Sequence, residues 1–179
     1  LKEQEEIMKQ SIVGKLFVNV IHGKGLARGD KDSSDSFCRI IFPNGDKVKS
    51  ETKDKNVNPI WNFKQNKQIN ILKKNMKPIK IDVWDHDFGL NADDYLGYVQ
   101  IDWNKCIENS GKWAINEIFT IQAPPNSTIV PDNNKWGELY VQVKFLKDGT
   151  ADDPTEPPLI QNLEEVLKLE SVPYPMQHD

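Results

Sequence analysis

The sequence predicts an all-β protein, an eight-stranded antiparallel β-sandwich followed by a short C-terminal helix. Apolar and polar residues alternate through most of the chain, and this period of two is typical of strands with one buried face. Clusters of Pro, Asn, Gly and Asp separate these stretches, which fits antiparallel connections. No ten-residue helical period lies between the strands, and this excludes a parallel α/β sheet. The 179 residues fit a single such domain.

Eight stretches carry the strand pattern. The clearest alternations are at residues 16–21, 79–84 and 138–145, where every second residue is Leu, Ile, Val or Phe. The others are at residues 37–42, 47–53, 60–71, 95–103 and 117–121. Residues 121–135 contain two adjacent prolines and no alternation, so we expect a long loop before the last strand.

The two ends of the chain differ in composition from the part between them. We expect an N-terminal helical or linker segment at residues 1–13, the sandwich at 14–146, and a Pro-rich acidic linker with a short amphipathic helix at 147–179. The helix is indicated by Leu159, Leu163, Val166 and Leu167, which fall on one helical face. Its polar face is acidic, which favours docking on protein over docking on a membrane. The charged opening segment predicts no secretory signal.

Charge and cysteine content exclude several classes of function. The 23 basic and 27 acidic residues give a net charge of −4, so the chain lacks the general basic field that holds nucleic acid. No apolar run reaches the length of about 18 residues that a membrane span needs. Cys38 and Cys106 are too few for a disulfide scaffold, and we expect two reduced structural thiols in a cytoplasmic protein.

Two predicted loops concentrate carboxylates. Asp30, Asp32 and Asp35 follow the first strand, and Asp85, Asp87, Asp93 and Asp94 follow the strand that ends at Trp84. Asp85 and Asp87 are two residues apart on an extending strand, so their side chains leave the same face. If both loops lie at one end of the sandwich, the carboxylates repel one another unless a cation neutralises them. Solvated turn aspartates are the alternative, since Asp is common in turns.

Calcium is the cation that fits these residue types. It takes about six to eight oxygen ligands in an adaptable geometry, which clustered aspartates and loop carbonyls can supply. Zinc prefers His and Cys, and His22, His86 and His178 are scattered along the chain. The EF-hand spacing fails in both loops, because the twelfth position, where Glu is required, is Ile41 or Leu96. The sequence therefore predicts a calcium site of another geometry.

Four motifs follow one another along the predicted strands and loops. They are Ser34-Asp35-Ser36-Phe37, Asn58-Pro59-Ile60-Trp61-Asn62, Val83-Trp84-Asp85-His86-Asp87 and Asp93-Asp94-Tyr95-Leu96-Gly97. In this order they resemble the C2 domains of synaptotagmins, protein kinases C and related trafficking proteins, and the likeness covers about residues 14–145. Ser36 replaces a proline of the family, which removes no ligand. Only 13 residues precede the first strand, and a strand at residues 137–141 follows the one that contains Phe119. This order resembles the type II arrangement, one of the family's two circularly permuted topologies.

The resemblance implies which aspartates bind calcium. The implied ligands are Asp30 and Asp35 from the first acidic loop, and Asp85, Asp87 and Asp93 or Asp94 from the other. Spacing from Asp87 favours Asp93, whereas spacing back from Gly97 favours Asp94, and both stay open. The first loop is one residue shorter than in the family, so Asp32 could share the role of Asp30.

The resemblance also implies a membrane surface. Without metal, an anionic bilayer would repel the acidic end, and bound calcium would remove that repulsion. Phe88 and Leu90 at the loop tip would then enter the interface, unless they pack against the neighbouring loop. Family members often bind phosphoinositide head groups on a basic strand. The matching residues here are Lys47, Lys49 and Lys53. Glu51 stands among them, and a solvated strand face is the alternative.

The expected function is calcium-dependent, reversible binding to anionic phospholipid membranes by a cytoplasmic protein of membrane trafficking or signalling. The alternative is a calcium-independent C2-like module that binds protein partners. We expect neither nucleic acid nor a small-molecule substrate. Asp87-Phe88-Gly89 resembles the kinase metal-binding triplet, but the sequence has no catalytic His-Arg-Asp, so we expect no enzyme.

Overall fold

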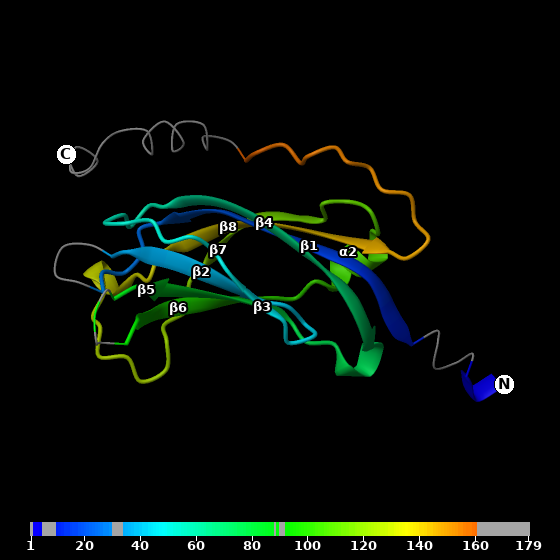
Figure 1. The fold of residues 1–179 in the computed structure, drawn as a ribbon, viewed down its shortest axis with the longest axis horizontal. Coiled ribbons are helices and arrows are strands. Elements are labelled where there is room, and N and C mark those ends of the chain that lie inside the picture. The colour runs from blue at the N-terminus through cyan, green and yellow to red at the C-terminus, as the bar shows by residue number, and fades with distance from the viewer. Residues whose placement is uncertain (1, 5–9, 30–33, 88, 90–91, 161–179) are drawn as a thin grey trace.

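The computed structural model describes residues 2–4, 10–29, 34–87, 89 and 92–160, and it confirms the all-β prediction. Two four-stranded antiparallel sheets lie face to face (Figure 1). Sheet A has the order β4 (Ile60–Leu72), β1 (Ser11–Lys24), β8 (Glu138–Lys147), β7 (Ile115–Thr120). Sheet B has the order β3 (Lys47–Lys49), β2 (Ser36–Ile41), β5 (Ile79–Asp85), β6 (Asp94–Ile101). The last strand, β8, thus lies beside the first. The type II arrangement itself stays a prediction.

Helical structure is confined to short segments in the described part of the chain. Residues 2–4 are helical, α2 spans Asn104–Glu108, and the 3-10 turns η1 and η2 span Lys73–Asn75 and Asp132–Asn134. Of the predicted C-terminal helix, Leu159 is described and is not helical, whereas Leu163, Val166 and Leu167 lie outside the described residues. No helix among the described residues is long and apolar enough to cross a membrane.

The core lies between the inner faces of the two sheets. Leu16, Val18 and Val20 alternate along β1 and are fully buried, and Ile81 and Val83 of β5 belong to the same cluster. This is the alternation that predicted the strands. Burying each such side chain contributes about 1.5 to 3 kcal/mol, so the inner faces hold the two sheets together.

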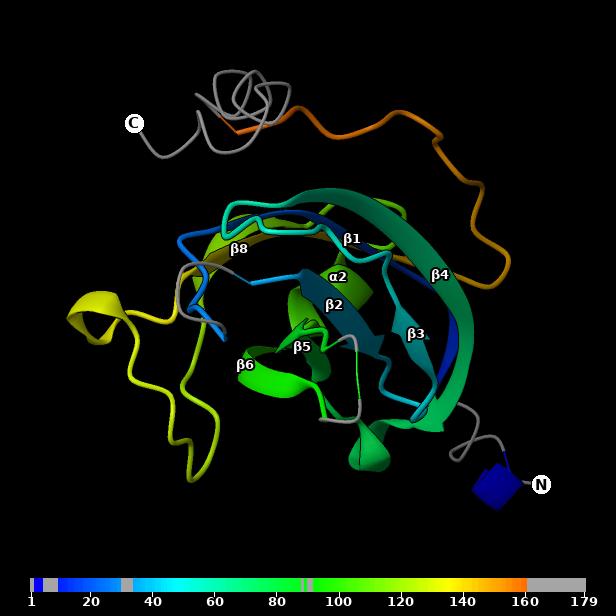
Figure 2. The ribbon, with the colours of Figure 1, turned by 60° about the vertical axis from the view of Figure 1, so that its left-hand side comes forward.

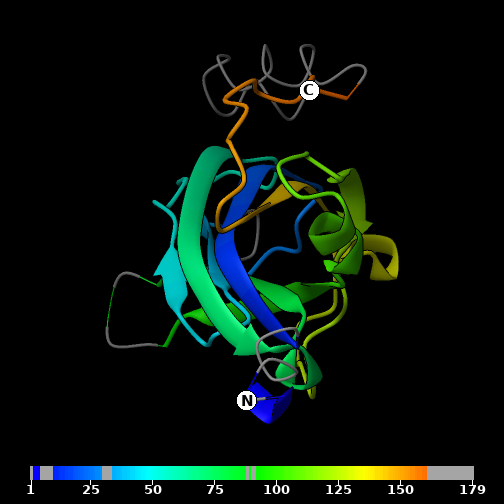
Figure 3. The same ribbon diagram turned by 90° about the vertical axis from the view of Figure 1, so that its right-hand side faces the viewer.

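Residues 148–160, here called the C-terminal strap, turn back after β8 and run across the outer face of sheet A (Figure 3). The Asn116 Nδ2 donates to the Pro158 carbonyl at 2.9 Å. The Ile160 N–H donates to the Tyr140 hydroxyl at 3.2 Å. The segment predicted as a linker is therefore fastened to the sandwich, and at the other end β1 begins at Ser11. The domain boundaries at 14 and 146 stay a prediction.

Four loops meet at one end of the sandwich, here called the acidic pole (Figure 2). They are residues 25–35 between β1 and β2, 50–59 between β3 and β4, 86–93 between β5 and β6, and 121–137 between β7 and β8. Backbone hydrogen bonds join neighbouring loops. The Leu26 N–H donates to the Val57 carbonyl at 2.9 Å, and the His86 N–H donates to the Asp35 carbonyl at 2.7 Å. The two acidic loops therefore lie at the same end.

Candidate functional site

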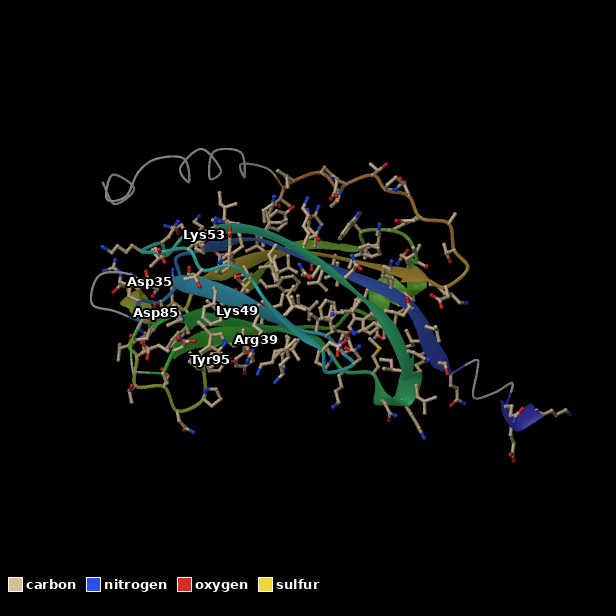
Figure 4. The ribbon with its side chains drawn as sticks, viewed as in Figure 1. Asp35, Arg39, Lys49, Lys53, Asp85 and Tyr95 are labelled. Carbon is tan, nitrogen blue, oxygen red and sulfur yellow. The ribbon has the colours of Figure 1, made fainter. Side chains whose placement is uncertain are left out.

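Asp85 lies at the acidic pole, where β5 ends. It is the last residue of β5, in step with the buried Val83, and is 2% exposed. Its Oδ1 accepts a hydrogen bond from the Asp35 N–H at 2.7 Å. Asp35 Oδ1 in turn accepts one from the Lys55 N–H at 2.8 Å. Two of the predicted ligands, one from each acidic loop, are thus in direct contact (Figure 4).

The backbone of Gly29 closes one side of Asp85. A Cβ atom on Gly29 would lie 2.0 Å from Asp85 Oδ2, so any larger residue would displace the carboxylate or the loop. Ser34 holds this part of the loop, because its hydroxyl accepts from the Gly29 N–H at 2.7 Å and donates to the Ala27 carbonyl at 2.9 Å. Gly29 was not among the predicted site residues, and its one sequence signal is its position directly before Asp30.

Asp93 and Asp94 have different places in the loop between β5 and β6. Asp93 Oδ1 accepts a hydrogen bond from the Asp87 N–H at 2.9 Å and lies 3.0 Å from His86 Nδ1. Asp93 therefore braces the loop. Asp94 begins β6 and pairs with Asp85 in the ladder, so the Asp85 and Asp94 side chains leave the same face of sheet B.

The described carboxylates fit a hard cation in their chemistry. Asp35, Asp85 and Asp87 offer oxygen ligands of the kind that calcium takes. The described residues contain no group of three or more His, Cys, Asp or Glu side chains placed closely enough to hold a metal ion. Of the remaining predicted residues, Asp30, its alternative Asp32, Phe88 and Leu90 lie outside the described residues.

The predicted basic strand is shorter than expected. β3 ends at Lys49, because the Ser50 hydroxyl accepts from the Cys38 N–H at 3.0 Å where a ladder carbonyl would do so. Lys53 is therefore not on the strand of Lys47 and Lys49: it forms an isolated bridge with Ser36, and its Nζ pairs with Glu51 at 2.9 Å. The prediction that all three lysines lie on one strand is therefore wrong for Lys53.

Lys49 instead belongs to a set of side chains on the outer face of sheet B, here called the basic-aromatic face. Its members are Phe37, Arg39, Lys47, Lys49, Lys80, Asp82, Trp84, Tyr95 and Tyr98. Lys49 Nζ lies 4.1 Å from the Phe37 ring centre, and Lys80 Nζ lies 5.0 Å from the Tyr98 ring centre. Figure 4 shows Arg39, Lys49 and Tyr95 on this face.

Asp82 is the acid within the basic-aromatic face, and it is only 2% exposed. Its carboxylate accepts from Arg39 Nη2 at 2.9 Å and from the Tyr95 hydroxyl at 2.8 Å. Burial, and then the hydrogen bond to Asp82, raise the pKa of the Tyr95 hydroxyl, so Tyr95 stays a donor at neutral pH. Arg39, Lys80 and Tyr95 were not among the predicted site residues, although their alternation with buried neighbours along β2, β5 and β6 places them on one face.

Both cysteines are free and buried. Burial raises the pKa of the Cys38 thiol to about 12 and that of the Cys106 thiol to about 12. Because a thiolate is the reactive form, neither side chain is an activated nucleophile at neutral pH. Their state agrees with the reduced structural thiols expected from the sequence.

Comparison with known proteins identifies one family. Residues 14–125 match the C2 domain family model. Protein C2-DOMAIN ABA-RELATED 6 of Arabidopsis thaliana is 39% identical over 101 residues, which cover 56% of this chain and 55% of that protein. Rabphilin-1 of Caenorhabditis elegans is 31% identical over 113 residues, which cover 55% of this chain and 10% of that protein. The chain thus spans about half or less of these relatives.

A solved structure shares the fold. A calcium-bound structure of the two C2 domains of extended synaptotagmin 2 superposes with a TM-score of 0.60 at 22% identity, over 76% of this chain and 46% of that chain. At this identity the likeness concerns the arrangement of the strands. The family match ends at residue 125, before β8 and the C-terminal strap.

Proposed function

Because this chain belongs to the C2 domain family, we propose that it is a reversible membrane-targeting module that binds anionic phospholipids through the acidic pole when calcium is present. The observation that carries the proposal is the hydrogen bond from the Asp35 N–H to Asp85 Oδ1, which joins the two acidic loops at one end of the sandwich, where the backbone of Gly29 lies against Asp85. Carboxylates of two loops at the same end of the sandwich repel one another unless a cation offsets their charge. The calcium-bound state of the structural neighbour supports the same choice of ion.

We assign the ligands as Asp30, Asp35, Asp85, Asp87 and Asp94. Asp94 is preferred over Asp93 because it stands opposite Asp85 in the ladder, whereas the Asp93 carboxylate holds the Asp87 N–H and contacts His86. In this assignment Asp93 positions the loop and does not bind the ion.

The chain's own residues explain why binding would depend on calcium. Calcium, when bound, supplies positive charge that offsets the carboxylates of the pole. Hydrogen bonds from the Asp35 N–H to Asp85 and from the Lys55 N–H to Asp35 hold both carboxylates in place before any ligand arrives. Phe88 and Leu90, from the loop that carries Asp87, would then enter the membrane interface. Burial there contributes about 1.5 to 3 kcal/mol for each side chain.

Substitution of two ligands tests the proposal. We expect wild-type protein to sediment with phosphatidylserine vesicles in calcium and to remain in solution with chelator. The double variant Asp85→Asn, Asp87→Asn should lose this sedimentation and the calcium-induced rise in melting temperature. Glu108→Gln in α2 removes an exposed acid at the opposite end and serves as the control. A double variant that keeps both responses would place the calcium site elsewhere.

The basic-aromatic face is a second candidate, for phosphoinositide head groups. Lys47 and Lys49 are exposed there, and the one acid on this face, among the residues that the structure describes, is buried and bonded to Arg39 and Tyr95. Clustered cations of this kind attract anionic head groups. We assign Lys53 to the edge of the basic-aromatic face, because Glu51 partly offsets its charge.

A calcium-independent module for protein partners is the alternative function. Such a module would show neither a calcium-induced melting shift nor calcium-dependent sedimentation, so the same experiment separates the two. We propose a cytoplasmic location with reversible attachment to membranes, and a binding role without catalysis. Membership of the C2 domain family supports a lipid-binding or membrane-targeting role in general.

A further inference from the structure

The β7–β8 loop, residues 121–137, presents an apolar side chain to solvent beside the acidic pole. Val130 is 83% exposed, the largest exposed fraction among the large apolar side chains that the structure describes. Its neighbours are not exposed in this way, since Pro131 is buried and Ile129 packs against the core. A single exposed valine is common on protein surfaces, so its surroundings decide its meaning.

The backbone around Val130 is held by local hydrogen bonds. The Ile129 N–H donates to the Ser127 hydroxyl at 3.1 Å, and the Asn134 N–H donates to the Pro131 carbonyl at 3.1 Å. At the end of the loop, a Cβ on Gly137 would lie 2.7 Å from the Gly25 carbonyl oxygen, so the β7–β8 and β1–β2 loops are in close contact. These contacts hold the loop that carries Val130 at the acidic pole.

Val130 forms one wall of a hollow between three loops of the acidic pole. Leu26 lines it from the β1–β2 loop and Val57 from the β3–β4 loop, and Arg28 and Lys135 contribute positive charge. Arg28 Nη2 lies 3.5 Å from Asp132 Oδ2, and the two side chains are 43% and 77% exposed. An exposed pair of this kind is weak and leaves most of the five N–H donors of the guanidinium available.

We propose that this hollow is a lipid contact of its own, which binds an anionic phospholipid of the bilayer with Val130 in the apolar layer and Arg28 and Lys135 at the head group. The charge fits such a lipid, because the described residues that line the hollow include two cations, Arg28 and Lys135, and one acid, Asp132. The position fits as well: Arg28, which lines the hollow, directly precedes Gly29, whose backbone lies against Asp85 at the acidic pole. The inference rests on the proposed function, which brings this end of the molecule to the membrane.

The hollow adds a contact that is distinct from calcium binding. Its described lining residues include none of the assigned calcium ligands. Loss of Val130 should therefore weaken vesicle binding at saturating calcium and leave calcium binding by the free protein unchanged. Complete burial of one valine corresponds to about a tenfold change in partition, so partial burial gives roughly threefold to tenfold. Loss of one cation near an anionic surface corresponds to about fivefold.

The test compares the full chain with Val130→Asn and with the double variant Arg28→Gln, Lys135→Gln. Ile118→Asn in β7, where the side chain is 53% exposed, is the matched control. Vesicles of phosphatidylcholine and phosphatidylserine in a ratio of roughly three to one supply the anionic surface. We expect Val130→Asn to bind these vesicles threefold to tenfold more weakly, and the double variant to lose affinity for them but not for neutral vesicles. Ile118→Asn should bind as wild type does.

The melting temperature in calcium, measured without vesicles, shows that each variant folds and binds the ion. Equal vesicle affinity of Val130→Asn and wild type would overturn the inference and leave the proposed function intact. A wild-type protein that fails to bind the vesicles in calcium would overturn both. Equal loss in Ile118→Asn and Val130→Asn would show a general effect of apolar surface and would also overturn the inference.

Discussion

The outer faces of the two sheets use the same chemistry in different ways. On sheet A, Lys144 Nζ lies 4.4 Å from the Phe17 ring centre and 5.0 Å from the Trp113 ring centre, and its side chain is 4% exposed. On sheet B, Lys49 Nζ lies 4.1 Å from the Phe37 ring centre, but Lys49 is exposed. The difference is that the C-terminal strap binds the first lysine through Asp152 and the Asp153 carbonyl.

The polar groups on the covered face of sheet A bind the strap. On sheet A, Lys144 Nζ donates to Asp152 Oδ1 at 2.9 Å. The Tyr140 hydroxyl donates to Asn116 Oδ1 and also accepts from the Ile160 N–H of the strap. The strap thus occupies the polar groups of Lys144 and Tyr140, with which a ligand on this face would interact. Lysines over aromatic rings indicate a binding surface only where the fold leaves them open, which on this molecule favours sheet B.

The largest effect is expected on the covered face. Asp152→Ala removes the carboxylate that pairs with Lys144 and should lower the free energy of unfolding by about 2 kcal/mol. This is less than the usual cost for a fully buried pair, because Asp152 is 41% exposed and Lys144 also reaches the Asp153 carbonyl at 3.5 Å. Chemical denaturation measures the change.

Asp148→Ala is the control for this prediction. Asp148 is also in the strap, but its partner Gln68 is neutral and exposed, so its loss should change stability little. If Asp152→Ala unfolds at the same denaturant concentration as wild type, the strap does not hold Lys144, and the contrast between the two faces fails.

An intermediate effect is expected from replacing each lysine by methionine. Lys144→Met keeps an apolar side chain between Phe17 and Trp113, so stability should change little and lipid binding not at all. Lys49→Met should leave stability unchanged and weaken binding to phosphoinositide vesicles about fivefold, because a cation near an anionic surface contributes about 1 kcal/mol.

Lys112→Met, at an exposed site between α2 and β7, controls for the loss of one positive charge. Vesicle sedimentation and thermal melts of the variants give both readouts. Equal losses of binding in Lys49→Met and Lys112→Met would mean that net charge decides binding and that the basic-aromatic face has no special role.

Much of the fold follows from short-range pattern. The alternation that places Val18 and Val143 in the core predicts β1 and β8, although β1 begins five residues before the predicted stretch. The strap could not be predicted in this way, because its acids and prolines have the composition of a linker. Lys144 stands at a position of β8 that the alternation assigns to solvent, and its burial depends on a partner eight residues later.

The residue types of the site could be predicted from the sequence better than the way these residues contact one another. Motif order implied that Asp35 and Asp85 lie at the same pole, and the structure joins them by a hydrogen bond. The cover provided by Gly29 and the brace formed by Asp93 depend on how each loop folds back on itself. The spacing of residues along the sequence does not predict these contacts.

The smallest expected effect is on the pH dependence of stability. One titrating residue in each sheet is involved. On sheet A, burial lowers the pKa of His22 below its usual 6.5, although a hydrogen bond to the Pro59 carbonyl opposes the shift. Below pH 6.5 the unfolded chain therefore binds a proton that the folded protein does not, and stability falls as the pH decreases. On sheet B, burial and Asp82 raise the pKa of Tyr95 above its usual 10.0, so stability should fall as the pH rises above 10.0.

Two variants separate these limits. His22→Gln keeps a donor for the Pro59 carbonyl but cannot titrate, so its stability should fall less steeply than that of wild type as the pH decreases below 6.5, with no change in the alkaline limb. Tyr95→Phe should flatten only the alkaline limb. Denaturation midpoints across the pH range measure both slopes. Because His22 and Tyr95 lie in different sheets, the two changes should add in the double variant. A single variant that altered both limbs would show that the two sheets are coupled more strongly than their separate packing implies.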